Sequence, residues 1–243
     1  MYTLFRKEIS GFFSTLTGYI VIIVFLVING LFMWIFPGAY NVLDSGYATL
    51  DTLFVIAPWV FLFLAPAVTM RMFADEKKSG TIELLYTRPL TDFQIIFAKY
   101  LAGLVLVLFS ILPALIYFYS VYKLGNPVGN IDTGGTWGSF IGLFFLAAIY
   151  VAIGVLSSSF TENQIVAFVL GMLLCFLVYI GFDYVSELSL FRSFDGFIIN
   201  LGINEHYKSM SRGVIDSRDM IYFISVIAFF LLVTKTILHS RKW

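Results

Sequence analysis

Long apolar stretches alternate with short polar ones along the whole chain. A helix needs about 20 mostly apolar residues to cross a hydrocarbon core about 30 Å thick. Six stretches reach or approach that length: Gly18–Phe36, Thr52–Met70, Ile95–Val121, Trp137–Leu156, Ile165–Phe182 and Met220–Ile237. The pattern predicts an all-α integral membrane protein, one domain over residues 1–243, with six transmembrane helices and both termini on the same side.

The composition excludes a water-soluble fold for a chain of 243 residues. Hydrophobic residues make up 60% and charged residues 12%, whereas soluble domains average about 45–50% apolar and about 25% charged. Lysine plus arginine and aspartate plus glutamate both number 15, so there is no net positive charge to attract nucleic acid. We therefore expect the lipid bilayer as a partner, and no nucleic acid.

Basic residues are distributed unequally between the two sides of the predicted membrane. On the side away from the termini lie Lys123, Arg192, Lys208, Arg212 and Arg218. On the side of the termini lie Arg6, Lys7, Arg71, Lys77, Lys78, Arg88, Lys99, Lys235, Arg241 and Lys242. By the positive-inside rule both termini are cytoplasmic. Lys99 and Lys235 fall in the end turns of their spans, where we expect their side chains to extend to the interface.

The segment 1–17 predicts a separate helix ahead of the first span. Phe5, Ile9, Phe12 and Leu16 recur at helical intervals, and polar residues occupy the rest of the helix surface. Such a helix lies in the cytoplasmic interface, or it extends the first span inward. A signal peptide is not expected, because the following apolar run is a full span long and ends without the small residues of a cleavage site.

Three prolines fall inside predicted spans. Pro58 and Pro66 lie in the second and Pro113 in the third. Each removes a backbone donor and tends to kink its helix.

The polar segment 71–94 contains helix-capping and helix-breaking residues that a flexible linker would not need. In "SGTIELLYTRP", Ser79 or Gly80 can cap a helix of about two turns, with Glu83 near its first free amides. Pro89 forces Arg88 out of helical geometry and ends that helix. The sequence therefore predicts a short helix and a break before the third span.

The short helix carries apolar side chains that it cannot bury against itself. Ile82, Leu84 and Leu85 are surrounded by charged residues, and a helix of two turns has no interior of its own. They need either a partner protein or the headgroup region of the membrane, and the residues alone leave both open.

Two capping-box patterns begin predicted spans. Thr91 and Gln94 precede the third span, and Thr161 and Gln164 precede the fifth. Glu162 in the second of these turns is expected to interact with the helix dipole rather than to act as a catalytic acid.

The outer segment 185–219 is long and mixed in polarity. Phe191, Phe194, Ile198 and Leu201 recur at helical intervals and predict an amphipathic or re-entrant helix at the outer face. The residues alone permit an interfacial cap, whereas a place in an outer gate is what the family resemblance described below implies, and both remain open.

No pattern in the chain predicts catalysis. There is no Gly-x-x-x-x-Gly-Lys-[Ser/Thr] loop to hold phosphates, so any ATP must be bound by another chain. His206 and His239 are far apart and on opposite sides, Asp183 has no acidic neighbour at its depth, and the lone Cys175 cannot form an internal disulfide. We expect a non-enzyme without cofactor or metal of its own.

At this point the residues carry a family resemblance. "DEKKSGTIELLYTRPLTDFQIIFAKYLAG", residues 75–103, resembles the cytoplasmic signature of ABC-2 type transporter permeases. The six spans, the N-terminal helix, the turn "SSSFTENQIVA" and the ending "LLVTKTILHSRKW" are similar as well. Within the family the chain is most similar to gliding-motility-associated permease subunits, with copper-enzyme-maturation permeases as nearer cousins than polysaccharide or drug exporters.

The resemblance implies an ABC-2, type V exporter-like permease fold in a bacterial inner membrane. It implies that a cytosolic ABC ATPase, which binds ATP and Mg, docks on a coupling helix at Gly80 to Leu85, and that a second permease subunit completes the path. The implied coupling residues are Glu76, Gly80, Thr81, Ile82, Glu83, Leu84, Leu85 and Pro89. A subunit that transmits mechanical work without moving a solute is the alternative from a different class.

Overall fold

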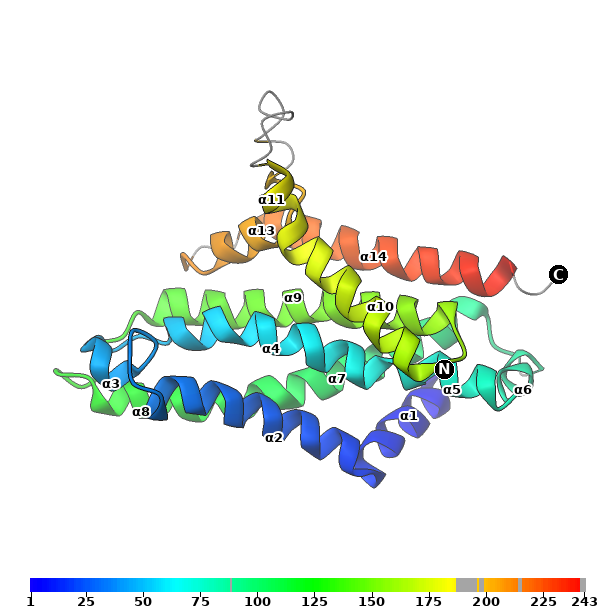
Figure 1. Ribbon diagram of the computed structural model, residues 1–243, viewed down its shortest axis with the longest axis horizontal. Helices are drawn as coiled ribbons and strands as arrows, with labels where there is room; N and C mark the ends of the chain where they lie inside the picture. The colour runs from blue at the N-terminus through cyan, green and yellow to red at the C-terminus, as the bar shows by residue number, and fades with distance from the viewer. Residues whose placement is uncertain (88, 187–195, 197–198, 214–215, 241–243) are drawn as a thin grey trace.

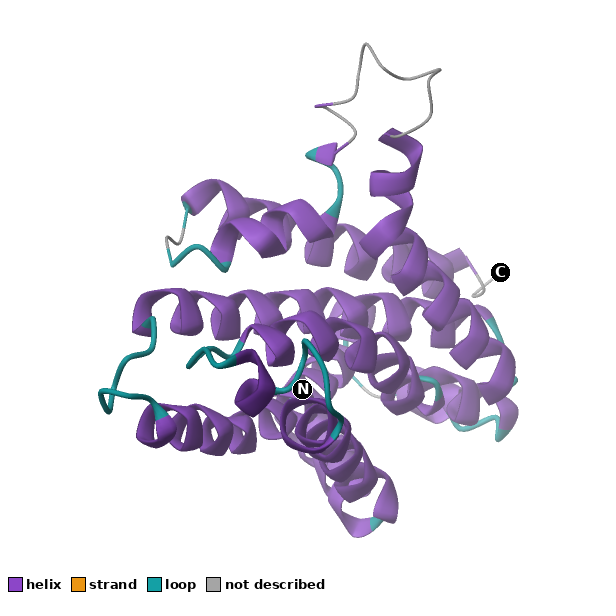
Figure 2. Cartoon of the chain, turned by 60° about the vertical axis from the view of Figure 1, so that its left-hand side comes forward, coloured by secondary structure: helices purple, strands orange, loops and turns teal. Residues whose placement is uncertain are grey.

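The computed structural model describes the chain except for residues 88, 187–195, 197–198, 214–215 and 241–243. The regular elements of the described residues are all helical (Figure 2). Six of their helical stretches are long and apolar enough to cross a membrane: Leu16–Ile35, Asp51–Lys78, Asp92–Leu124, Thr133–Phe160, Gln164–Ser186 and Ser217–Ser240. The six predicted spans are confirmed within four residues of their predicted ends, except that the second stretch continues past Met70 to Lys78.

The helices follow one another along the bundle in an up-and-down order (Figure 1). The first half of the chain forms α1 (Tyr2–Ser14), α2 (Leu16–Gly30), α3 (Val42–Ser45), α4 (Asp51–Thr69), α5 (Arg71–Lys78), α6 (Ile82–Tyr86), α7 (Asp92–Ile111) and α8 (Leu115–Leu124). The second half forms α9 (Thr133–Phe160), α10 (Gln164–Phe176), α11 (Phe182–Ser186), α13 (Ile203–Met210) and α14 (Ser217–Ser240). Short π-helical stretches continue α2 over Leu31–Ile35 and α10 over Leu177–Gly181.

Helix α9 lies at the centre of the bundle. It packs against α4, α7, α10 and α14, and 83% of its most apolar 18-residue stretch is buried. Gly154 permits the closest approach, because a Cβ there would lie 2.0 Å from the Oγ1 of Thr69 on α4. Helix α9 is therefore the element against which most of the other spans are positioned.

Helix α1 is distinct from the first span. Thr15 has an extended backbone, with φ −112° and ψ 160°, and the chain turns sharply there (Figure 1). The predicted separate helix is confirmed, and Phe5, Ile9 and Phe12 on it are partly buried. Leu16 does not belong to that face, because it starts α2 and is 75% exposed.

The prolines act unequally on their spans. Pro113 lies in a 3-10 turn, Leu112–Ala114, that separates α7 from α8. Helix α4 continues through Pro58 and Pro66 and ends at Thr69, after which Met70 separates it from α5.

The two ends of the bundle differ in what they carry. Helices α5 and α6, the start of α1 and the end of α14 lie at one end, here called the α5–α6 end (Figure 1). Nδ1 of His239 near the C-terminus is 3.6 Å from Oδ2 of Asp92 at the start of α7, which places both termini at that end. Helices α3 and α13 lie at the opposite end, here called the α13 end.

Candidate functional site: the α5–α6 end

Helix α5 begins with a cap supplied by another span. Oγ of Ser158, on α9, accepts hydrogen bonds from the backbone amides of Phe73 at 2.9 Å and Ala74 at 3.1 Å. The same hydroxyl donates to the Met70 carbonyl at 3.0 Å. The free amides of a helix N-terminus need such partners when they are buried. The cap fixes the direction in which α5 leaves the second span.

A tight turn joins α5 to α6. Gly80 has a φ of +69° and its amide bonds to the Lys77 carbonyl, which is the usual conformation of a glycine just past a helix end. Oγ of Ser79 donates to the Asp75 carbonyl at 2.7 Å, and the Thr81 hydroxyl lies 2.9 Å from it. The turn is held by its own side chains as well as by its backbone.

The predicted start and length of the short helix need correction. Gly80 ends α5 instead of capping α6, and Thr81 occupies the N-cap position of α6 without a side-chain cap bond. Helix α6 has five residues, shorter than the predicted two turns, because α5 already uses the chain up to Lys78. Arg88, which Pro89 was expected to displace from helical geometry, lies outside the described residues.

The apolar side chains of α6 do not behave alike. Ile82 and Leu85 are partly buried against the protein's own core, which corrects the expectation that all three need an external partner. Leu84 is 65% exposed, and Glu83 is exposed beside it. Leu84 therefore remains as the apolar side chain presented outward.

A groove of about 470 Å³ lies between α1 and α6. Its lining includes Leu4 and Lys7 of α1, Glu76 of α5, and Leu84 and Leu85 of α6. Its lining combines the apolar Leu4, Leu84 and Leu85 with the charged Lys7 and Glu76.

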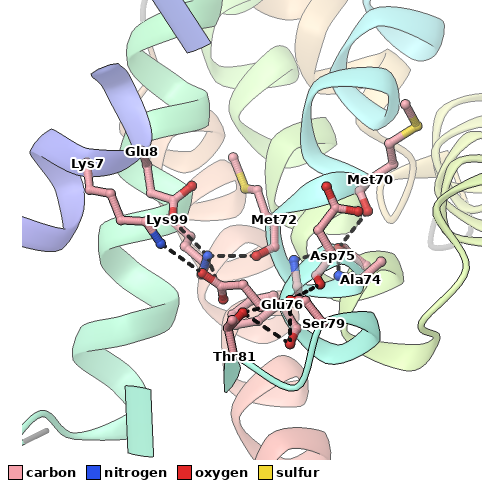
Figure 3. A network of polar contacts seen from close by, with 12 residues as sticks. Lys7, Glu8, Met70, Met72, Ala74, Asp75, Glu76, Ser79, Thr81 and Lys99 are labelled. Atoms are coloured by element: carbon pink, nitrogen blue, oxygen red, sulfur yellow. Dashed lines mark hydrogen bonds and ion pairs between the residues drawn. The ribbon is translucent and has the colours of Figure 1, made fainter. Parts of the chain in front are cut away.

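Lys99 joins three helices through a buried ion-pair cluster (Figure 3). Its side chain is 1% exposed, and Nζ lies 2.8 Å from Oε1 of Glu8 on α1 and 2.9 Å from Oε2 of Glu76 on α5. Nζ also donates to the Met72 carbonyl at 2.6 Å. The contact with Glu76 is an ion pair without the alignment of a hydrogen bond. Lys7 lies 3.4 Å from the other oxygen of Glu76, so two cations and two anions balance.

The cluster was not predicted from the sequence. Lys99 was expected in the first turn of the third span with its side chain extended to the interface, but α7 starts at Asp92 and places Lys99 two turns inside. Glu8 was missed altogether. The available signals were a lysine within an apolar helix and an acid between Lys7 and Ile9 of α1, and only tertiary structure joins them.

The second turn at this end, Phe160 to Gln164, contacts the first. The side-chain amide of Gln164 donates to Oδ1 of Asp75, and Nζ of Lys77 donates to the Ser159 carbonyl. The predicted cap is wrong here, because Asn163 is the N-cap of α10 and its side chain accepts from the Ile165 amide at 2.9 Å. Thr161 instead accepts from the Asn163 amide, and Glu162 is exposed ahead of the helix.

The capping box before α7 is confirmed. The Gln94 amide donates to Oγ1 of Thr91 at 3.3 Å, and the Thr91 amide donates to Oε1 of Gln94 at 3.2 Å. The span that carries Lys99 therefore has a defined start.

The predicted outer candidates can be placed only in part. Phe191, Phe194 and Ile198 lie outside the described residues. Leu201 is 43% exposed, and its carbonyl accepts a hydrogen bond from the Tyr222 hydroxyl at 2.6 Å. Its role in an outer gate stays a prediction.

Helix α13 follows Leu201 and is fastened to three neighbours. Nδ1 of His206 lies 2.6 Å from Oδ1 of Asp219 on α14. The side-chain amide of Asn204 donates to Oδ2 of Asp183 on α11 at 2.6 Å. The Tyr207 hydroxyl donates to the Phe54 carbonyl at 2.8 Å. Burial raises the pKa of the Tyr207 phenol well above its usual range, so it remains a donor at physiological pH.

Candidate catalytic and metal groups do not gather in the described part of the chain. Within those residues no three His, Cys, Asp or Glu side chains lie close enough to hold a metal ion. The serines at 157–159 are buried, and each hydroxyl bonds to backbone atoms.

These features define a class: a multi-pass membrane subunit with a structured helical excursion at one end. Residues 39–191, more than half of the chain, match the model of the ABC-2 family transporter proteins. The chain belongs to this family, whose members are permease subunits that span the membrane, lack an ATPase site of their own in general, and work with an ATPase subunit. No curated protein matches the chain.

Proposed function

We propose that the chain is a permease subunit on which a cytosolic ATPase docks through α5 and α6. The observation that carries the proposal is Leu84, an exposed apolar residue on a helix whose Ile82 and Leu85 pack inward. The adjoining groove between α1 and α6 supplies a receptor surface of about 470 Å³. ATP and Mg would be bound by the partner, and the free energy of hydrolysis would enter this chain as a push on α6.

The contacts around α5 support a route for that push. Lys99 ties α5 to α7 and α1, and Ser158 ties the start of α5 to the central helix α9. A displacement of α6 would therefore move a group of helices together rather than bend one loop. Such rigid-body motion is common in proteins that switch between two conformations.

The orientation and assembly follow from this proposal. The α5–α6 end would face the cytoplasm of a bacterial cell, with both termini on that side of the inner membrane, as the excess of basic residues favours. A second permease subunit, identical or homologous, would complete the transport path. Membership of the gliding-motility-associated subgroup rests on the sequence resemblance.

Copurification tests the docking proposal. The full chain is isolated from membranes through a tag, and the bound ATPase is measured for the wild type and for Leu84→Ser. We expect the change to release most of the ATPase, because an exposed apolar anchor at an interface centre contributes about 2 kcal/mol or more, roughly 30-fold in affinity.

The matched control is Leu43→Ser. Leu43 lies on α3 at the α13 end and is 63% exposed, so the same chemical change is made away from α6. Changing Ile82 or Leu85 would be a poor test, because both pack on the protein itself. Equal ATPase recovery from the Leu84 and Leu43 variants, or none from the wild type, contradicts the docking proposal.

A further inference from the structure

A cavity of about 570 Å³ lies at the α13 end, between α4, α9, the stretch from Tyr179 to Tyr184, and α13. Its volume falls within the range of about 300–1,000 Å³ that is typical of sites for small ligands. The coupling proposal above gives it no role. Its walls combine aromatic residues with charged ones, which is the arrangement of a site for an amphiphile.

The apolar part of the wall continues out of the cavity along α4. Val55 and Trp59 line it, and Phe63 follows one turn further on. The three side chains recur at i, i+4 and i+8 and are 46%, 41% and 51% exposed, so they form one open stripe. Trp59 is held edge-on against Tyr179 with ring centroids 5.8 Å apart. The stripe runs from the end of the span toward its middle and suits an acyl chain.

The charged part of the wall sits where lipid headgroups would be. Asp51 is the first residue of the second candidate span, and Asp183 is three residues from the end of the fifth. Lys208 of α13 lines the same cavity. Asp183 is held by the Asn204 amide, and none of the three charges forms an ion pair with another described residue.

We propose that this cavity binds a membrane lipid with a zwitterionic aminophosphate head, of the phosphoethanolamine type. Its ammonium group would lie against the carboxylates of Asp51 and Asp183, and its phosphate would lie near Lys208. One acyl chain would follow Val55, Trp59 and Phe63 along α4. Lipid binding at this site requires no ATPase, so it is tested independently of the docking proposal.

Native mass spectrometry of the purified full chain tests the site. The protein is mixed in detergent with equal amounts of phosphatidylethanolamine and phosphatidylglycerol that carry the same acyl chains, and the lipids retained are counted. We expect the wild type to retain the ethanolamine lipid preferentially. Asp183→Asn should reduce that preference by about tenfold, because it removes the charge from one charge-assisted hydrogen bond.

Glu205→Gln is the matched control, since Glu205 lies on α13 but outside the cavity lining. If Asp183→Asn fails to fold by size-exclusion chromatography, Asp51→Asn makes the same charge test at an exposed position. Lys208→Gln should lower retention of both lipids and keep the preference for ethanolamine. Equal retention of both lipids by the wild type, or the same preference in the aspartate variants as in Glu205→Gln, overturns the proposal.

Discussion

The two ends of the bundle satisfy their polar groups in different ways. At the α5–α6 end, Lys99 is buried and pairs with two partly buried glutamates, so that the cluster bridges α1, α5 and α7. At the α13 end, His206 and Asp219 bridge only α13 and α14, and the charges of Asp51, Asp183 and Lys208 surround a cavity instead of one another. The first end is joined into one body, and the second end keeps room for a ligand.

The difference has a physical basis in the cost of burying charge. A buried ion pair gains little net stability over an apolar core, but removal of one partner leaves an unpaired charge that is expensive. The Lys99 cluster therefore contributes less to overall stability than to fixing the positions of three helices. Asp51 and Lys208 form no ion pair with another described residue, so these two charges impose no such constraint at the α13 end.

The largest predicted effect comes from Lys99→Met. It would leave Glu8 and Glu76 without their shared cation, at side-chain exposures of only 14% and 12%. We expect a loss of about 3–5 kcal/mol in the free energy of unfolding, measured by equilibrium denaturation in mixed micelles.

Lys78→Met is its control, because Lys78 is an exposed lysine on the same excursion. Addition of Glu76→Gln to Lys99→Met should restore part of the loss, since it removes one of the two charges that lose Lys99. Equal stability of the Lys99 and Lys78 variants would show that the cluster does not hold the three helices.

A smaller effect is predicted for Ser158→Ala. The change leaves two buried amides at the start of α5 and the Met70 carbonyl without their partner. We expect a loss of about 2 kcal/mol in the free energy of unfolding and faster hydrogen exchange at Phe73 and Ala74. Ser159→Ala is the matched control, because that hydroxyl is equally buried but bonds only to Leu156 in its own helix. Identical exchange rates in the two variants would remove Ser158 as the cap of α5.

The sequence predicts most of the fold because its main signals are local. A run of about 20 apolar residues is sufficient to identify a span, and all six were found in this way. The capping box of Thr91 and Gln94 involves residues three apart, so its pattern predicts its geometry. The apolar face of residues 1–17 predicted a helix there, but the residues left open whether that helix extends the first span, and the break at Thr15 decides it.

The site is harder to predict because its contacts join distant segments. Ser158 caps a helix that starts more than 80 positions earlier, and Glu8 meets Lys99 across 91 positions. Two local predictions were wrong: Gly80, one of two residues predicted to cap α6, ends α5 instead, and Asn163 takes the cap that was assigned to Thr161. A glycine suits a helix end better than a helix start, since it adopts positive φ without strain.

The smallest effect is predicted for His206→Gln at the α13 end. The His206 ring contacts Asp219 and the Asn200 carbonyl and stacks on Tyr222, and an amide can replace only one of the two polar contacts. We expect a loss of about 1 kcal/mol in the free energy of unfolding, because the amide keeps one of the two polar contacts of the ring. ATPase recovery in copurification should stay at the wild-type value, since no contact of α5 or α6 changes.

His239→Gln is the control at the opposite end, where the contact with Asp92 is longer, at 3.6 Å. A loss for His206→Gln as large as that for Lys99→Met would mean that the two ends are joined equally firmly, and the contrast between them would be wrong.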